Sequence, residues 1–170
     1  MTEFLFYHLQ GQGAEAVLPA LIEKSVERGW RVVVQTALEE RVDALDAHLW
    51  TYRDDSFLPH GTFREATAAE QPVLLVVDDR NPNGATVRFL IDRAPPPPDA
   101  ERYDRVVLLF DGEDDEALDE ARRHWQEVKA RGFAVTYWRR GVAAPRMRVR
   151  TSRVHSQGAR GGPVIVMMMS

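Results

Sequence analysis

Short apolar runs alternate with amphipathic stretches along residues 1–140 of the chain. Runs rich in Val, Leu and Ile, each bounded by polar or turn-forming residues, are typical of strands that are buried on both faces. They fall at residues 4–9, 31–36, 73–77, 87–91, 106–110 and 133–138. Between some of them, apolar residues at three- and four-residue spacing predict helices over 14–28, 39–50 and 114–130.

This order of elements predicts the fold class. Strands separated by helical segments are typical of α/β proteins, in which right-handed crossovers build a parallel sheet. We therefore expect a three-layer, Rossmann-like α/β fold, with a mainly parallel sheet flanked by helices. A chain of 170 residues with 44% hydrophobic content is long enough to bury one core. We assign residues 1–140 to that single domain.

The distribution of charge separates residues 141–170 from the domain. No Asp or Glu follows Glu127, whereas the last 30 residues carry five arginines, at 146, 148, 150, 153 and 160. Glycines and Pro163 accompany them, and this composition predicts a basic, flexible C-terminal tail. Such a tail can contact nucleic acid or an acidic partner. The net charge of −4 argues against a DNA-binding surface over the whole molecule.

Composition also bears on the cellular location. The chain has no cysteine, which excludes disulfides and thiolate sites and fits a reducing compartment. Its first residues lack the basic start of a secretion signal, and no apolar run reaches the ~18 residues typical of a membrane span. These features predict a cytoplasmic protein that does not cross a membrane.

Candidate catalytic, metal and cofactor motifs are incomplete. Gly11-Gln12-Gly13 opens a predicted helix but lacks the third glycine of a dinucleotide fingerprint. The acidic residues between 111 and 116 could hold magnesium, but acids at a helix start also complement its positive end, which is the simpler interpretation. The histidines lack zinc-site spacing, and Ser56 near His60 has no nucleophile elbow around it. We expect no catalytic residue, no metal and no cofactor.

The segment after the second predicted helix is dense in aromatic side chains. Trp50, Tyr52 and Phe57 alternate with charged residues, and Pro59 and Gly61 end regular structure. Two interpretations stay open. The rings plug the edge of the core, or they form a protein-binding surface, because Trp and Tyr often dominate interface energies.

Several positions fit the pattern of one known family. They are Tyr7 and Leu9, Leu49-Trp50, Ser56-Phe57-Leu58-Pro59-His60, Gln71-Pro72-Val73, Ala121-Arg122, Trp125 and Gly132-Phe133. Over about residues 1–140 the chain resembles the chi subunit of bacterial DNA polymerase III, and the Trp to Phe-x-Pro-His segment is the most specific part. The tail after Arg140 does not resemble the family.

The resemblance implies a non-catalytic accessory subunit of the clamp-loader complex. Such a protein pairs with the psi subunit and holds the C-terminal tail of single-stranded DNA-binding protein, so that its contact with DNA is mainly indirect. The resemblance places psi binding at Trp50, Phe57, Leu58, Pro59 and His60. In relatives the same patch also takes a repair helicase.

The resemblance places the tail-binding site on the last helix. Its residues are Arg122, Trp125, Gln126 and Lys129, whose spacing puts them on one side of the helix. Arg122 would contact the terminal carboxylate of the tail, and Trp125 would form part of an apolar slot. Better-known relatives carry lysine where this chain has Gln126, which removes one charged contact unless Arg123 or Lys129 compensates. Alternatively, Trp125 belongs wholly to the core stripe of the helix.

A second class of function fits the same architecture. Parallel α/β sheets commonly bind ligands at the carboxyl ends of their strands. A nucleotide-binding regulator or enzyme is therefore the alternative to a protein-binding bridge.

Overall fold

The computed structural model describes residues 2–55 and 57–140 of the chain, and the predicted 141–170 tail lies outside them. The six predicted strands all form, within one or two residues of the expected bounds. They are β1 (Glu3–Leu9), β2 (Val32–Gln35), β4 (Val73–Val76), β5 (Val87–Leu90), β6 (Arg105–Asp111) and β7 (Ala134–Arg140). The three predicted helices are α1 (Ala14–Glu27), α2 (Glu39–Thr51) and α3 (Asp115–Ala130).

Three short elements were not predicted. They are the two-residue strand β3 (Gly61–Thr62) and the 3₁₀ turns η1 (Ala68–Glu70) and η2 (Ala100–Arg102). Each is too short to give a periodic pattern in the sequence. No helix in the described part of the chain is long and apolar enough to cross a membrane.

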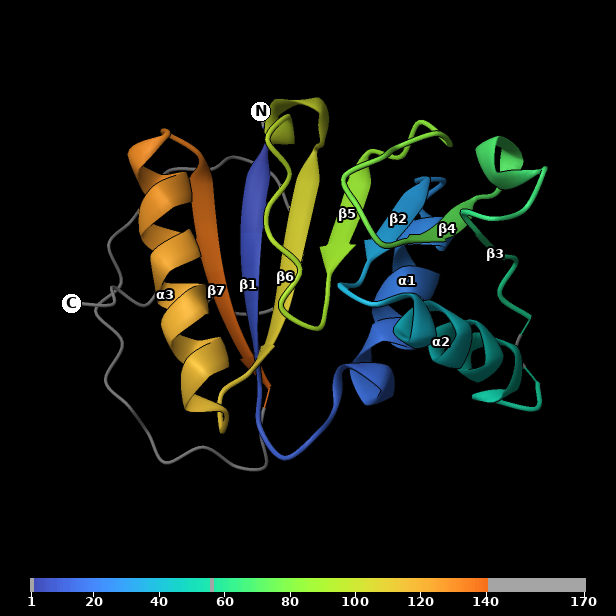
Figure 1. Cartoon of the computed structure of the whole chain (residues 1–170), viewed down its shortest axis with the longest axis horizontal. Helices are drawn as coiled ribbons and strands as arrows, with labels where there is room; N and C mark the ends of the chain where they lie inside the picture. The colour runs from blue at the N-terminus through green and yellow to red at the C-terminus, as the bar shows by residue number, and fades with distance from the viewer. Residues whose placement is uncertain (1, 56, 141–170) are drawn as a thin grey trace.

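The strands form one seven-stranded sheet in the order β3-β4-β2-β5-β6-β1-β7, and every pair in it is parallel. This confirms the predicted α/β fold with a parallel sheet. Figure 1 shows α3 lying along β7 at one end of the sheet, with α2 near β3 and β4 at the other. Because the strands are parallel, all their carboxyl ends lie along the same edge.

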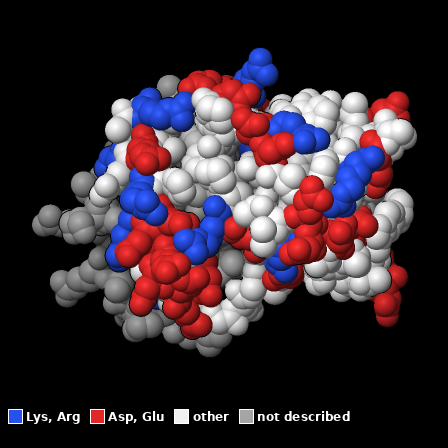
Figure 2. Space-filling model, viewed as in Figure 1, with Lys and Arg blue, Asp and Glu red and all other residues white. Residues whose placement is uncertain are grey.

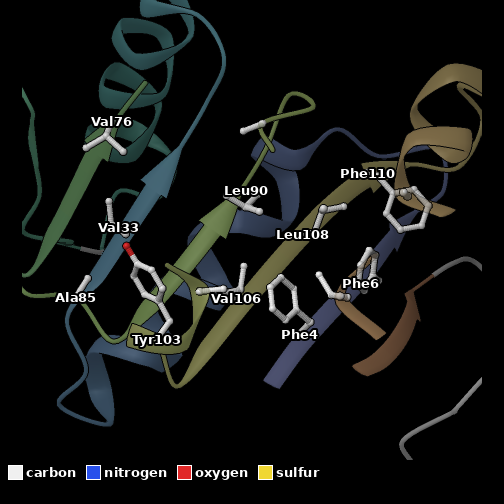
Figure 3. Packing of buried hydrophobic residues seen from close by; sticks show 14 of the residues in the cluster. Phe4, Phe6, Val33, Val76, Ala85, Leu90, Tyr103, Val106, Leu108 and Phe110 are labelled. Atoms are coloured by element: carbon white, nitrogen blue, oxygen red, sulfur yellow. The ribbon is translucent and has the colours of Figure 1, made fainter. Parts of the chain in front are cut away.

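Helices cover both faces of the sheet, and alternate residues of each strand point to opposite faces. On the face covered by α3, Phe4 and Phe6 of β1 pack with Val106, Leu108 and Phe110 of β6, and Figure 3 shows this row of side chains. The other face packs against α1 and α2 through a second cluster that includes Val34 and Leu75. The two buried faces explain why the strands are almost continuously apolar.

The acidic residues before α3 act at the start of the helix. Asp114 is its N-cap, and one carboxylate oxygen accepts hydrogen bonds from the backbone N–H groups of Glu116 and Ala117 at 3.0 and 3.2 Å. Among the described residues, no group of three or more His, Asp or Glu side chains is arranged to hold a metal ion. Helix capping therefore accounts for at least part of this acidic group.

One charged side chain, Arg88 of β5, is fully buried in the core. Its partners are all neutral. Nε and Nη2 donate to Gln35 Oε1 at 3.1 and 2.9 Å, and Nη1 donates to the Tyr103 hydroxyl at 3.0 Å. The remaining donors reach the backbone carbonyls of Asp78 and Arg80, at 2.5 and 3.1 Å. Burial lowers the pKa of Arg88. The guanidinium thus ties the loop after β4 to the centre of the sheet.

Replacing Arg88 tests this role. Arg88→Ala should lower the free energy of unfolding by ~3 kcal/mol or more, because it leaves a cavity and several buried oxygens without donors. Urea unfolding measures the loss. Arg105→Ala is the matched control, since Arg105 is a half-exposed strand arginine whose Nε lies 3.9 Å from Glu3 Oε2. It should cost under about 1 kcal/mol. Equal losses in the two variants would contradict the role of Arg88.

Candidate functional site

Two aromatic side chains near the end of α2 form an exposed pair. Trp50 lies in the last turn of α2 and Phe57 in the loop that follows. Their ring centroids are 5.8 Å apart, and the two residues are 48% and 75% exposed. The interpretation that both rings plug the edge of the core is therefore wrong. Large apolar rings at this exposure mark a surface that suits a protein partner.

Buried side chains next to Trp50 and Phe57 fix the segment that carries this aromatic pair. The ring of His60 lies 4.4 Å from that of Trp50, and its own side chain is fully buried. His60 Nδ1 lies 2.7 Å from the backbone oxygen of Leu58, and Nε2 lies 2.9 Å from Asp46 Oδ1. Leu58 is buried in the core cluster with α1 and α2, whereas Pro59 is half-buried. Of the predicted set, only Trp50, Phe57 and part of Pro59 are open to a partner.

Polar residues border the aromatic pair. The Arg53 guanidinium lies 3.0 Å from Asp55 Oδ1 and 4.0 Å from Glu23 Oε1, and Asp54 is also exposed. An apolar centre with a charged rim is the usual layout of a protein interface. The sequence pattern does not reveal that Asp46 holds His60 in place. Its position four residues before Trp50 on the same helix was the available signal.

The second predicted surface lies on α3. Arg122, Gln126 and Lys129 are all exposed, and their spacing puts them along one strip of the helix. Trp125, between them in sequence, is only 6% exposed. Its ring packs against Phe6 and Tyr137, with centroids 5.2 and 6.3 Å away. Trp125 therefore belongs to the core, as the alternative interpretation had it, and it offers little surface to a ligand.

Two half-buried apolar side chains border the core on this side of the sheet. Leu118 of α3 and Val135 of β7 are half-buried and pack against the same core cluster as Trp125. Neither is recognisable as a site residue in the sequence, because each looks like an ordinary core position. The Arg122 guanidinium lies 3.5 Å from Asp119 Oδ1 on the helix surface. Such an exposed pair is weak, so Arg122 can exchange Asp119 for another carboxylate.

The two surfaces lie at opposite ends of the sheet. The aromatic pair belongs to α2 and its following loop, and α2 contacts β3 and β4. The strip of α3 lies by β7, which α3 contacts at the other end of the strand order. Figure 1 shows this separation.

A cavity of about 550 Å³ opens at the carboxyl ends of the strands, between the start of α1 and α3. Six carboxylates line it: Glu15, Asp92, Asp111, Glu113, Asp114 and Glu120. Figure 2 shows acidic side chains gathered over this end of α3. Arg93 is its one lining arginine, and it is bonded to Glu116 and Glu120. We call this cavity the acidic crevice.

The acidic crevice occupies the place where α/β proteins often bind nucleotides, but its charge is unsuitable for phosphates. A Cβ atom built on Gly13, the N-cap of α1, would lie 2.6 Å from Glu15 Oε2. The carboxylate of Glu15 thus covers the helix start that would otherwise attract an anion. Burial alone would raise the pKa of Glu15, but the hydrogen bond from Arg41 outweighs it and lowers that pKa. Glu15 therefore stays negative.

A buried histidine lies near the acidic crevice, at the end of β1. His8 Nδ1 is hydrogen-bonded to the Tyr137 hydroxyl, and Nε2 has no hydrogen-bond partner among the described residues. A Cβ atom on Gly112 would lie 1.6 Å from Nε2, so only glycine leaves room for the ring. Burial, together with the charge of Arg139, lowers the pKa of His8, although Asp111 opposes the shift. The ring is therefore neutral in the folded protein at neutral pH.

Comparison with known proteins points to one family. The family model described as "DNA polymerase III chi subunit, HolC" matches residues 1–136. A relative from Rickettsia prowazekii, named "Probable DNA polymerase III subunit chi", is 31% identical over 91 residues, which are 54% of this chain and 55% of the relative. The "DNA polymerase III subunit chi" of Pseudomonas aeruginosa is 35% identical over 78 residues, 44% of this chain and 54% of the relative. The chain spans about half the length of these curated relatives.

The neutral state of His8 predicts a pH dependence. Because its folded pKa is below the value of about 6.5 in an unfolded chain, the unfolded state binds the proton more readily, and stability falls as pH drops through 6.5. His8→Asn should flatten the change in the free energy of unfolding between about pH 7 and 5. Urea unfolding across this range measures it. An equally steep fall in the variant would contradict the assignment.

Proposed function

The chain belongs to the DNA polymerase III chi subunit family, and we propose that it is a non-catalytic accessory subunit of the clamp-loader complex. In this proposal it joins the psi subunit to the C-terminal tail of single-stranded DNA-binding protein during replication. The observation that carries the proposal is the pair of surfaces at opposite ends of one sheet. Two partners can contact them without touching each other.

The exposed aromatic pair supports the proposed psi contact. Trp50 and Phe57 stand out of a polar surface, while His60 and Leu58 fix the segment that carries them. A preformed pair loses little side-chain freedom on binding, which favours a persistent partner. The same surface suits the repair helicase that binds this patch in relatives, in which case the two partners would compete.

The strip on α3 supports the proposed tail contact. The target is an acidic peptide that ends in an aromatic residue with a free carboxylate. Arg122 and Lys129 supply exposed cations, and the half-buried Leu118, four residues before Arg122 on α3, supplies apolar surface beside it. A charge-assisted bond from Arg122 to the carboxylate gives the contact its direction. Contact with DNA is then mainly indirect, through the bound protein.

The competing function, a nucleotide-binding regulator or enzyme, finds little support in the acidic crevice. Phosphates would have to enter a cavity with six carboxylates in its lining. A nucleotide should therefore give no thermal shift, whereas a real ligand would stabilise the protein by mass action.

The psi contact is tested by removing the aromatic pair. Trp50→Ala combined with Phe57→Ala should weaken binding to purified psi by ~100-fold or more, because two exposed rings at an interface centre are each worth over 1 kcal/mol. Isothermal titration calorimetry measures it. Leu38→Ala is the matched control, since Leu38 is 55% exposed but lies at the other end of α2. Unchanged affinity in the double variant would refute the psi contact.

The tail contact is tested with a labelled acidic peptide that ends in Pro-Phe with a free carboxylate. Arg122→Ala should weaken binding by ~10-fold or more, as expected for loss of a charge-assisted hydrogen bond. Gln126→Lys should tighten it by about three-fold, because it adds an exposed cation. Fluorescence anisotropy measures both changes.

Arg102→Ala is the control for the tail contact. Arg102 is also an exposed arginine facing an aspartate three residues away, but it lies in η2. That turn meets α3 at its C-cap, through the Glu101–Arg131 ion pair, and not along the strip. It should leave peptide affinity unchanged. If Arg122→Ala and Arg102→Ala behave alike, or if the peptide amide binds as well as the free acid, the proposed site is wrong.

A further inference from the structure

The acidic crevice contains carboxylates that no arginine or lysine neutralises within the described residues. Glu15 and Asp92 are bonded to Arg41, and Glu120 is bonded to Arg93. The other three, Asp111, Glu113 and Asp114, have no ion-pair partner in residues 2–55 and 57–140. Asp111 and Asp114 accept only backbone N–H bonds there. One wall of the crevice therefore keeps uncompensated negative charge.

The floor of the crevice is apolar. Leu9, Leu90, Leu108 and Phe110 line it from β1, β5 and β6, and Ala117 and Ala121 line it from α3. An acidic wall over an apolar floor is suited to a segment that carries cations on one side and apolar groups on the other. A small inorganic cation would not use the floor.

The last strand of the described part of the chain, β7, ends at this edge of the sheet. In the register of the sheet, Leu9 pairs with Asp111 of β6 on one side and with Arg140 of β7 on the other. Two strand spacings separate Asp111 from Arg140, which is about 10 Å. The five residues 141–145 can extend up to ~17 Å. Arg146 can therefore reach the acidic wall without unfolding any described element.

The sequence after Arg140 has the complementary chemistry. Residues 146–150 read Arg-Met-Arg-Val-Arg, and in an extended chain the three arginines point to one side and the two apolar residues to the other. Residues 141–170 carry five arginines and no acid, a net charge of +5. Because the whole chain has a net charge of −4, residues 1–140 carry −9. Charge and pattern both match the crevice.

We propose that residues 146–150 dock in the acidic crevice of their own domain, with Arg146, Arg148 and Arg150 along the wall of Asp111, Glu113 and Asp114. The contact is intramolecular, so a short tether gives it a high effective concentration even if each ion pair is weak. Docking neutralises the carboxyl edge of the sheet. It also removes these arginines from competition for nucleic acid.

A spin label in the full chain tests the docking. Because the chain has no cysteine, Thr151→Cys provides a single site for a nitroxide, whose relaxation effect on nearby amides is read by NMR. The amides of Gly11 and Gly112, at the crevice, should lose more than half their intensity. The amide of Gly84, in the loop before β5, should lose little. Raising the salt to about 0.5 M should restore the signals, since it screens ion pairs.

Two further variants distinguish specific docking of residues 146–150 from closeness that results only from their covalent link to β7. Arg146, Arg148 and Arg150 changed together to Gln keep the tether but not the charge, and should restore most of the signal at Gly11 and Gly112. Asp111→Asn with Glu113→Gln, made in the domain, should do the same. Equal signal loss in the Arg and Gln tails, or no loss in either, would overturn the proposal. The proposal would also be overturned if the amide signals of Gly11 and Gly112 changed only when an oligonucleotide was added. That result would assign the arginines to nucleic acid.

Discussion

The parallel direction of all seven strands is the constraint on which the other features depend. It requires helices on both faces, so the faces are filled by core side chains and cannot serve a partner. The surfaces left for binding are the two ends of the strand order and the two edges at which the strands begin and end. The aromatic pair and the strip on α3 use the ends, whereas the acidic crevice lies along the carboxyl edge. The separation of these three surfaces follows from the topology.

Charge decides what each of these surfaces can bind. The carboxyl edge, which binds anionic ligands in many α/β proteins, here carries acidic side chains, one of which covers the start of α1. The exposed cations of Arg122 and Lys129 lie instead on the outer side of α3. The charges of this layout suit the proposed contact of an acidic peptide with α3 and the proposed docking of a basic segment in the crevice. Membership of a polymerase subunit family agrees with a protein-binding role.

Sequence patterns were sufficient for the fold but only partly for the sites. Runs such as Val32-Val33-Val34 are long enough to identify a buried strand, whereas two residues of β3 are not. The exposure of Trp50 and Phe57 depends on how the loop after α2 is tied down by His60 and Leu58, which no local pattern reveals. Trp125 shares its stripe with core residues, and only the packing against Phe6 and Tyr137 assigns it to the core. The sequence groups Asp111, Glu113 and Asp114 of the acidic crevice, but Glu15, Asp92 and Glu120 come from other parts of the chain, so only the fold reveals its full charge.

If one domain holds two partners at once, as proposed, a ternary binding experiment shows it most directly. The affinity of the Pro-Phe peptide would be measured by anisotropy with and without saturating psi, and the complex would be sized by sedimentation. Independent surfaces predict the same peptide affinity in both cases, together with a particle that contains all three components. Loss of peptide binding when psi is bound would contradict the bridge, because it would mean that the two partners share one site or exclude each other.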